Sequence, residues 1–160
     1  MANFPSTLKR IGNSLTATNG DGDLLLGRVQ PQAVPLEESV LGAIMVDKDG
    51  FPSIIEILRK ESFYVEKNQI IFQIMSDLFG KSQPIDLLTV HESLKKAAML
   101  EHIGGISYLM ELTNKVGSAA NIEFHARIIA QKFIQRELIK VSTQIIHDSF
   151  EDTKDVLELL

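Results

Sequence analysis

The chain contains no cysteine and no tryptophan, and only 6% of its residues are aromatic. The absence of cysteine excludes disulfides and thiolate metal sites, and it fits the reducing cytoplasm, where we expect this protein to act. No apolar run approaches the roughly 18 residues that are needed to span a bilayer. The first 30 residues lack the apolar stretch and cleavage site of a secretory signal. The sequence therefore predicts a cytoplasmic protein that is not embedded in a membrane.

Positive charge is also scarce. The formal net charge is −5, and residues 118–160 hold five Lys or Arg against seven Asp or Glu. Binding to DNA or RNA through phosphates normally requires clustered cations, and a base-stacking platform requires aromatic side chains, which are few here. We therefore predict little direct nucleic-acid binding by this chain.

Patterns typical of catalysis are missing too. Gly80-Lys81-Ser82 matches the end of a phosphate-binding loop, but Met75 stands where that motif requires its first glycine, and the preceding residues have helical spacing. The four histidines form no HxxxH or HExxH pair; they are His91, His102, His125 and His147. We predict no catalytic residue, no cofactor and no metal site in this chain.

What the sequence does contain is helical periodicity. Pro35 suits the first turn of a helix, Glu37 and Glu38 suit its positive end, and Asp86 is a plausible cap for a later helix. Gly104-Gly105 marks a tight turn between helices. No segment shows convincing strand alternation. The predicted class is all-α: a disordered leader at residues 1–29, a small globular helical head at 30–117, an extended helical hairpin at 118–150 and the start of a linker helix at 151–160.

Residues 118–150 carry more apolar surface than one helix needs. On a helical wheel at about 100° per residue, a first stripe is followed by a second stripe that is rotated by roughly 120°. The first stripe consists of Ile122, Ala126, Ile129 and Phe133, and the second of Ile134, Leu138, Val141 and Ile145. The change between Phe133 and Ile134 favours two helices that meet in a tight turn.

Further apolar residues in this segment lie on neither stripe, so we expect an apolar surface that one copy of the chain leaves uncovered. We assign self-association and hairpin pairing to Ile128, Phe133, Ile134, Leu138 and Val141. We assign partner docking to Ile139, Ile145, Ile146 and Phe150. At the end of the chain, residues 154–160 restart a helical pattern, which is either a frayed tail or the beginning of a helix that continues in a longer parent protein.

Five blocks, in order, resemble the N-terminal domain of the bacterial DnaB-type replicative DNA helicases. The blocks are PQAVPLEESVLGAI at 31–44, SFY at 62–64 with IF at 71–72, PIDLLTV at 84–90, IGG at 103–105 with YLMEL at 108–112, and SAANI at 118–122. Each block alone is weak, but the ordered set is specific. The resemblance covers about 130 of the 160 residues.

The resemblance implies a function in assembly. In that family the N-terminal domains pair through helical hairpins, and three pairs form a collar above a hexameric motor that uses ATP and magnesium. It implies self-association, docking of the C-terminal domain of primase and a helicase loader as a further partner, with the motor lying beyond Leu160. Two other interpretations stay open from the residues alone: a freestanding all-α adaptor unrelated to replication, and an enzyme whose polar pocket the spacing does not reveal.

Overall fold

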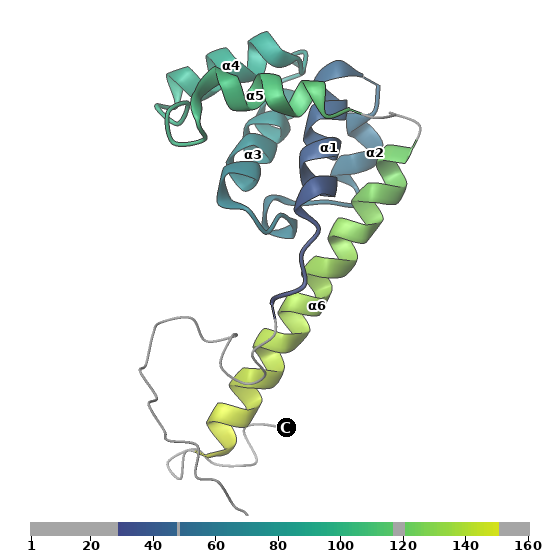
Figure 1. The fold of residues 1–160 in the computed structure, drawn as a ribbon, viewed down its shortest axis with the longest axis vertical. Coiled ribbons are helices and arrows are strands. Elements are labelled where there is room, and N and C mark those ends of the chain that lie inside the picture. Colours follow the sequence, from purple (N-terminus) through teal and green to yellow (C-terminus); the bar gives the residue numbers. More distant parts are fainter. Residues whose placement is uncertain (1–28, 48, 117–120, 151–160) are drawn as a thin grey trace, which may run out of the picture.

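The computed structural model describes residues 29–47, 49–116 and 121–150, and every regular element in these ranges is helical. The head contains α1 (Val34–Val46), α2 (Phe51–Ile55), a short 3₁₀ turn η1 (Lys60–Ser62), α3 (Glu66–Gly80), α4 (Leu87–Lys96) and α5 (Gly105–Asn114). The last helix, α6 (Ile122–Ser149), starts on the head and projects away from it (Figure 1). The all-α prediction is confirmed. None of the described helices is long and apolar enough to cross a membrane.

The helices of the head begin and end where local chemistry favours it. Pro35 stands in the first turn of α1, where a missing N–H costs nothing. Asp86 caps α4 by accepting hydrogen bonds from the backbone N–H groups of Leu88 and Thr89 at 3.0 and 2.9 Å. Gly104 and Gly105 have φ angles of 100° and 71°, in the left-handed region that favours glycine, and they lead into α5. All three predicted features are confirmed.

The core lies between α1, α3, α4 and α5, with α2 and the beginning of α6 closing it. Phe72 of α3 is at its centre, with ring centroids 5.7 Å from Phe51 and 4.9 Å from Phe63. Helices α1 and α5 approach so closely at Gly42 that a Cβ there would overlap the backbone carbonyl of Leu112. The head is therefore a closed unit that can hold α6 at a defined place.

Helix α6 is continuous over 28 residues, about 42 Å at ~1.5 Å per residue. The tight turn predicted between Phe133 and Ile134 is therefore wrong. The stripe changes there because the helix leaves the head: Ala126 and Ile129 are buried against it, whereas Ile134 and Leu138 are exposed. A rotated stripe signals a new packing surface, and periodicity does not show whether the chain also bends. The predicted leader (1–29, apart from Val29), the start of the predicted hairpin segment at 118–120 and the predicted linker start (151–160) lie outside the described residues.

Candidate interaction surface on the last helix

The first apolar stripe of α6 attaches the helix to the head. Ala126 and Ile129 are 0% and 1% exposed, and Ile122 packs against the same core. Phe133 is half-buried at the end of this stripe, with the guanidinium carbon of Arg59 4.8 Å from its ring centroid. The stripe ends here, and Phe133 is the last of its residues that the head partly buries.

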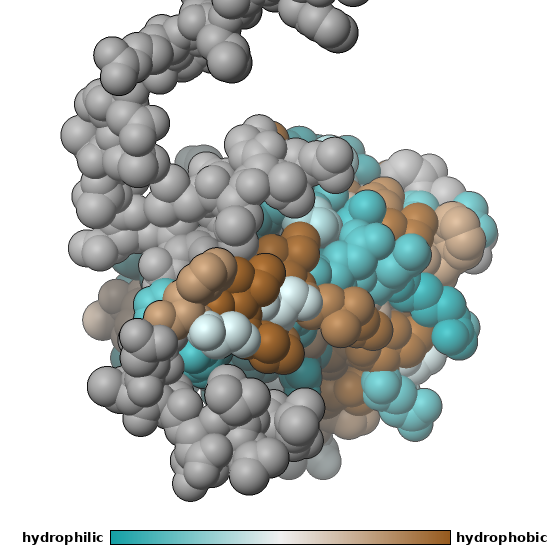
Figure 2. Space-filling view, turned by 90° about the horizontal axis from the view of Figure 1, so that it is seen from below, coloured by the Kyte–Doolittle hydropathy of each residue, from teal (hydrophilic) through white to brown (hydrophobic). Residues whose placement is uncertain are grey.

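Beyond Phe133 the large apolar side chains of α6, and that of its C-terminal cap residue Phe150, are exposed to solvent. Their exposed fractions range from 38% at Ile139 to 85% at Phe150. The set comprises Ile134, Leu138, Ile139, Val141, Ile145, Ile146 and Phe150. Figure 2, seen from the free end of α6, shows apolar residues gathered beside hydrophilic ones. The prediction that one copy leaves apolar side chains of this segment uncovered is confirmed, and such exposure is unusual without a partner.

Charge is absent from more than half of the circumference of this distal segment, residues 134–150. At about 100° per residue, the charged and titratable side chains fall within one sector of about 120°. They are Arg136, Glu137, Lys140, His147 and Asp148. The remaining sector, which we call the docking face, carries the seven exposed apolar residues, with Gln135, Ser142 and Ser149 between them. A surface that wide can contact two helices or two partners at once.

Of the nine residues predicted from the sequence, seven lie on the docking face. The other two, Ile128 and Phe133, are half-buried on the part of α6 that packs against the head. A groove of about 390 Å³ between α2, η1 and α6 joins the two parts, with Leu58, Ala130, Phe133 and Ile134 among its lining residues. Self-association and docking through these residues remain predictions.

Arg136 of α6 makes contacts with the head that the sequence analysis did not predict. Its guanidinium donates one hydrogen bond to the carbonyl oxygen of Pro31 at 2.9 Å and another to that of Ser62 at 2.8 Å. Its central carbon also lies 5.7 Å from the Phe133 ring centroid and 5.6 Å from that of Tyr64. Partial burial lowers the pKa of Arg136, while the negative charge of Glu37 opposes that shift. Only the folded chain brings these carbonyls together, so no motif could have predicted the contact.

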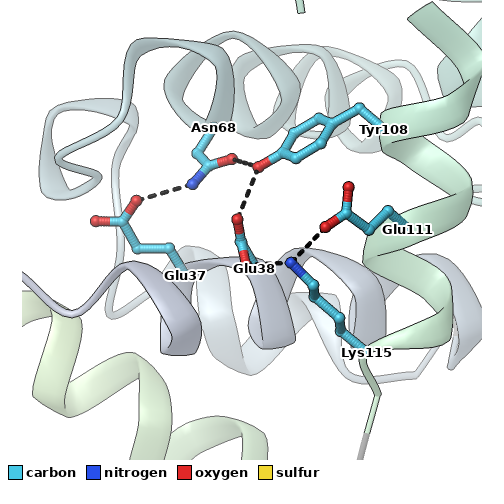
Figure 3. A network of polar contacts seen from close by, with 6 residues as sticks. All are labelled: Glu37, Glu38, Asn68, Tyr108, Glu111 and Lys115. Atoms are coloured by element: carbon cyan, nitrogen blue, oxygen red, sulfur yellow. Dashed lines mark hydrogen bonds and ion pairs between the residues drawn. The ribbon is translucent and has the colours of Figure 1, made fainter. Parts of the chain in front are cut away.

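A second polar cluster lies inside the head (Figure 3). It contains Glu37 of α1, which is only 1% exposed. Its carboxylate accepts hydrogen bonds from the backbone N–H groups of Tyr64 and Val65 at 2.6 and 3.4 Å, and from Asn68 Nδ2 at 2.9 Å. These donors surround the beginning of α3, which has no side-chain cap of its own. Glu37 therefore serves the positive end of α3, as well as that of its own helix, by charge-assisted hydrogen bonding.

The cluster continues to the surface through Tyr108 of α5. The Tyr108 hydroxyl donates to Asn68 Oδ1 at 2.7 Å and lies 3.4 Å from Glu38 Oε1 (Figure 3). Lys115 then bridges Glu38 and Glu111 at 2.8 and 2.6 Å. Burial, followed by the charge of Glu38, raises the pKa of Tyr108, so its hydroxyl stays a donor at neutral pH. The polar groups satisfy one another, which is typical of a network that aligns helices.

The Gly80-Lys81-Ser82 sequence, which the missing first glycine already argued against as a phosphate loop, lies at the C-terminal end of a helix. Gly80 is the last residue of α3, Lys81 is its C-terminal cap, and Ser82 has a φ of 53°. A phosphate loop would instead follow a buried strand and lead into a helix. Within the ranges that the structure describes, His, Asp and Glu form no group of three that could hold a metal ion.

The fold and this surface define a class: a helical head that holds a long helix with an uncovered apolar face, typical of a protein-interaction module. The chain belongs to the family described as DnaB-like helicase N terminal domain, which matches residues 29–131. It is 46% identical over 134 residues to the replicative DNA helicase DnaB of Rhodothermus marinus, and 41% identical over 137 residues to that of Geobacillus stearothermophilus. Both alignments cover 84% of this chain, but they cover only 14% of the Rhodothermus protein and 30% of the Geobacillus protein.

Solved structures agree. The crystal structure of the N-terminal domain of DnaB helicase from Mycobacterium tuberculosis superposes with a TM-score of 0.77 at 32% identity, covering 82% of this chain and 95% of that one. A DnaB-like replicative helicase, whose structure is described together with its interactions with primase, superposes with a TM-score of 0.63 at 28% identity. That match covers 72% of this chain and 27% of the helicase. The resemblance predicted from the ordered blocks is confirmed.

Proposed function

We propose that this chain is the non-catalytic assembly domain of a replicative DNA helicase, and that it organises the helicase ring and docks primase. The observation that carries the proposal is the docking face of α6, which is exposed, apolar and free of charge. Family membership supports a role in replication and argues against a freestanding adaptor. The relatives are replicative helicases, which also supports a cytoplasmic site of action.

Unwinding itself belongs, in this proposal, to a motor domain elsewhere in the parent protein. The chain spans at most 30% of the two relatives compared above, which leaves room in such a protein for a motor that binds ATP and magnesium. The position of Gly80 and Lys81 at the end of a helix supports a domain that holds no nucleotide itself. The scarcity of clustered cations supports little direct contact with DNA.

Self-association is the first role of the docking face. Burial of ~400 Å² of apolar area in total when two subunits pair is worth about 10 kcal/mol at ~25 cal/mol/Å². Association costs on the order of 4–15 kcal/mol, which offsets most of this gain. We therefore expect the chain to form weak dimers that depend on concentration, and three such dimers to form the collar of a hexamer in the parent protein.

Sedimentation of this chain over a range of concentrations tests the proposal. We expect a rise from monomer towards dimer in the high micromolar range. Leu138→Glu places a charge on the docking face and is expected to shift the chain to monomer. Lys140→Glu, which lies on the charged sector two residues along the same helix, is the matched control and should associate like the unchanged chain. A strict monomer at high micromolar concentration, or equal association by both variants, contradicts the assignment.

Primase docking is the second role, and we assign it to Ile139, Ile145, Ile146 and Phe150. Three of these residues lie on the side of the docking face away from Ile134 and Leu138, so the two contacts can coexist on one helix. The solved relative with primase interactions supports this class of partner. A helicase loader is a further candidate for the same apolar face.

A further inference from the structure

We propose that Arg136 is a positioning residue that sets the direction in which the distal segment of α6 leaves the head. The inference deepens the proposed function, because a docking face can pair with a partner in one geometry only if its helix is held at a defined angle. It rests on the position of Arg136 in α6 and on the two carbonyl groups that its side chain joins.

Arg136 stands at the point where apolar attachment ends. Ala126 and Ile129 are fully buried, Phe133 is half-buried, and from Ile134 onward the large apolar side chains are exposed. The helix continues for 13 residues from Arg136 to Ser149, about 20 Å at ~1.5 Å per residue. A small rotation at the edge of the head is therefore amplified along the distal segment.

The two hydrogen bonds of Arg136 restrain that rotation. One goes to the carbonyl of Pro31, in the segment that precedes α1, and the other to the carbonyl of Ser62, in η1. The Pro31 segment runs alongside α6 (Figure 1). A single hydrogen bond would act as a pivot, but a planar guanidinium that holds two carbonyls from different segments fixes an orientation.

Both anchors lie in or next to regular elements of the head. Ser62 is buried, and its hydroxyl accepts a hydrogen bond from the backbone N–H of Arg59 at 3.1 Å. The segment that carries Pro31 runs directly into α1, whose first turn closes with a hydrogen bond from Leu36 N to Ala33 O at 2.9 Å. Phe133 lies about one turn before Arg136 in α6, and the guanidinium of Arg59 lies over its ring. Arg136 therefore ties α6 to two ordered parts of the head.

The absence of cysteine allows a direct test by spin labelling. Lys95→Cys in α4 and Gln144→Cys in α6 give two exposed labelling sites, one on the head and one on the distal segment. Pulsed electron–electron double resonance measures the distance distribution between the two spin labels. An excess of unlabelled chain restricts the signal to pairs of labels within one copy. A pivot of about 20° at Arg136 would move residue 144, ~12 Å further along the helix, by about 4 Å.

We expect Arg136→Met to shift or widen this distribution by several ångströms, with unchanged helix content by circular dichroism. Lys140→Met is the matched control, because it removes the same charge from an exposed position one turn further on, and it should leave the distribution unchanged. Arg136→Lys keeps the charge but lacks the guanidinium fork, so it too should widen the distance distribution. This second variant keeps the test valid if Arg136→Met lowers the melting temperature of the head.

Distributions for Arg136→Met and Arg136→Lys that match the Lys140→Met control would overturn the inference. The measurement reports on single copies and does not depend on self-association. A chain that stays monomeric by sedimentation, yet shows the Arg136 effect, would contradict the proposed function and still support the positioning role.

Discussion

The head and the distal segment of α6 contain the same kinds of apolar residue in opposite situations. In the head, isoleucine, leucine and phenylalanine side chains such as Ile44, Leu109 and Phe72 are at most 1% exposed. In the distal segment, Ile134, Leu138 and Phe150 are more than half exposed. The head buries its apolar side chains within one copy, whereas the distal segment of α6 exposes its apolar side chains to solvent, away from that core. The head therefore accounts for the stability of the fold, and the proposed function assigns contact with partners to the distal segment.

The largest expected effect tests this division by removing one apolar side chain from each region. Phe72→Ala should lower the free energy of unfolding by about 3–5 kcal/mol, because it leaves a cavity between Phe51 and Phe63. Ile145→Ala, at a position 51% exposed, should change it by less than about 0.5 kcal/mol. Denaturant titration of dilute chain measures both. Similar losses in the two variants would mean that the distal segment is part of the folded core.

A middle-sized effect concerns the polar network that aligns α1, α3 and α5. Tyr108→Phe leaves the buried Asn68 Oδ1 without its donor and should cost about 1–2 kcal/mol. Tyr64→Phe is the matched control, because Tyr64 is 41% exposed, and it should have little effect on unfolding. Thermal melts at neutral pH compare the two variants.

The same tyrosine predicts how stability changes with pH. Because burial raises the pKa of Tyr108 in the folded state, its stabilising effect is fully present below the ordinary tyrosine value of about 10 and is lost as pH rises above that value. In the Tyr64→Phe variant, which retains Tyr108 alone, absorbance should report tyrosine ionisation only together with unfolding. Ionisation of Tyr108 in a chain that remains folded near pH 10 would contradict the buried network.

The smallest effect on stability should accompany a large effect on binding. Ile139→Asn on the docking face should change unfolding by less than about 0.5 kcal/mol, yet weaken binding of a primase C-terminal domain in calorimetry. Lys140→Asn, the adjacent residue on the charged sector, should bind like the unchanged chain. Equal affinities would remove Ile139 from the docking surface, and a marked loss of helicity would instead place it in internal packing.

Local chemistry accounts for the parts of the fold that were predicted correctly. Pro35, Asp86 and the Gly104-Gly105 pair act through their own backbone or side chains, so their effects on helix ends can be read residue by residue. The apolar stripe of α6 is likewise a property of spacing. The hairpin turn was predicted wrongly because the same rotation of a stripe results from a bend or from a straight helix that leaves its support.

The polar contacts that matter most joined residues far apart in the chain. Arg136 meets carbonyls 105 and 74 positions earlier, and Glu37 meets the start of α3 about 30 residues later. No periodicity records such pairs, because they depend on how the helices cross.

The order of residues alone determined that this chain would be helical, that its family blocks would be recognisable, and that residues 118–150 would carry more apolar surface than one helix needs. These properties follow from backbone preferences and spacing along a single helix. Only the tertiary structure decided which stripe the head covers and where α6 departs from it. That outcome depends on the crossing of helices and on distant carbonyl groups, which a one-dimensional pattern does not contain.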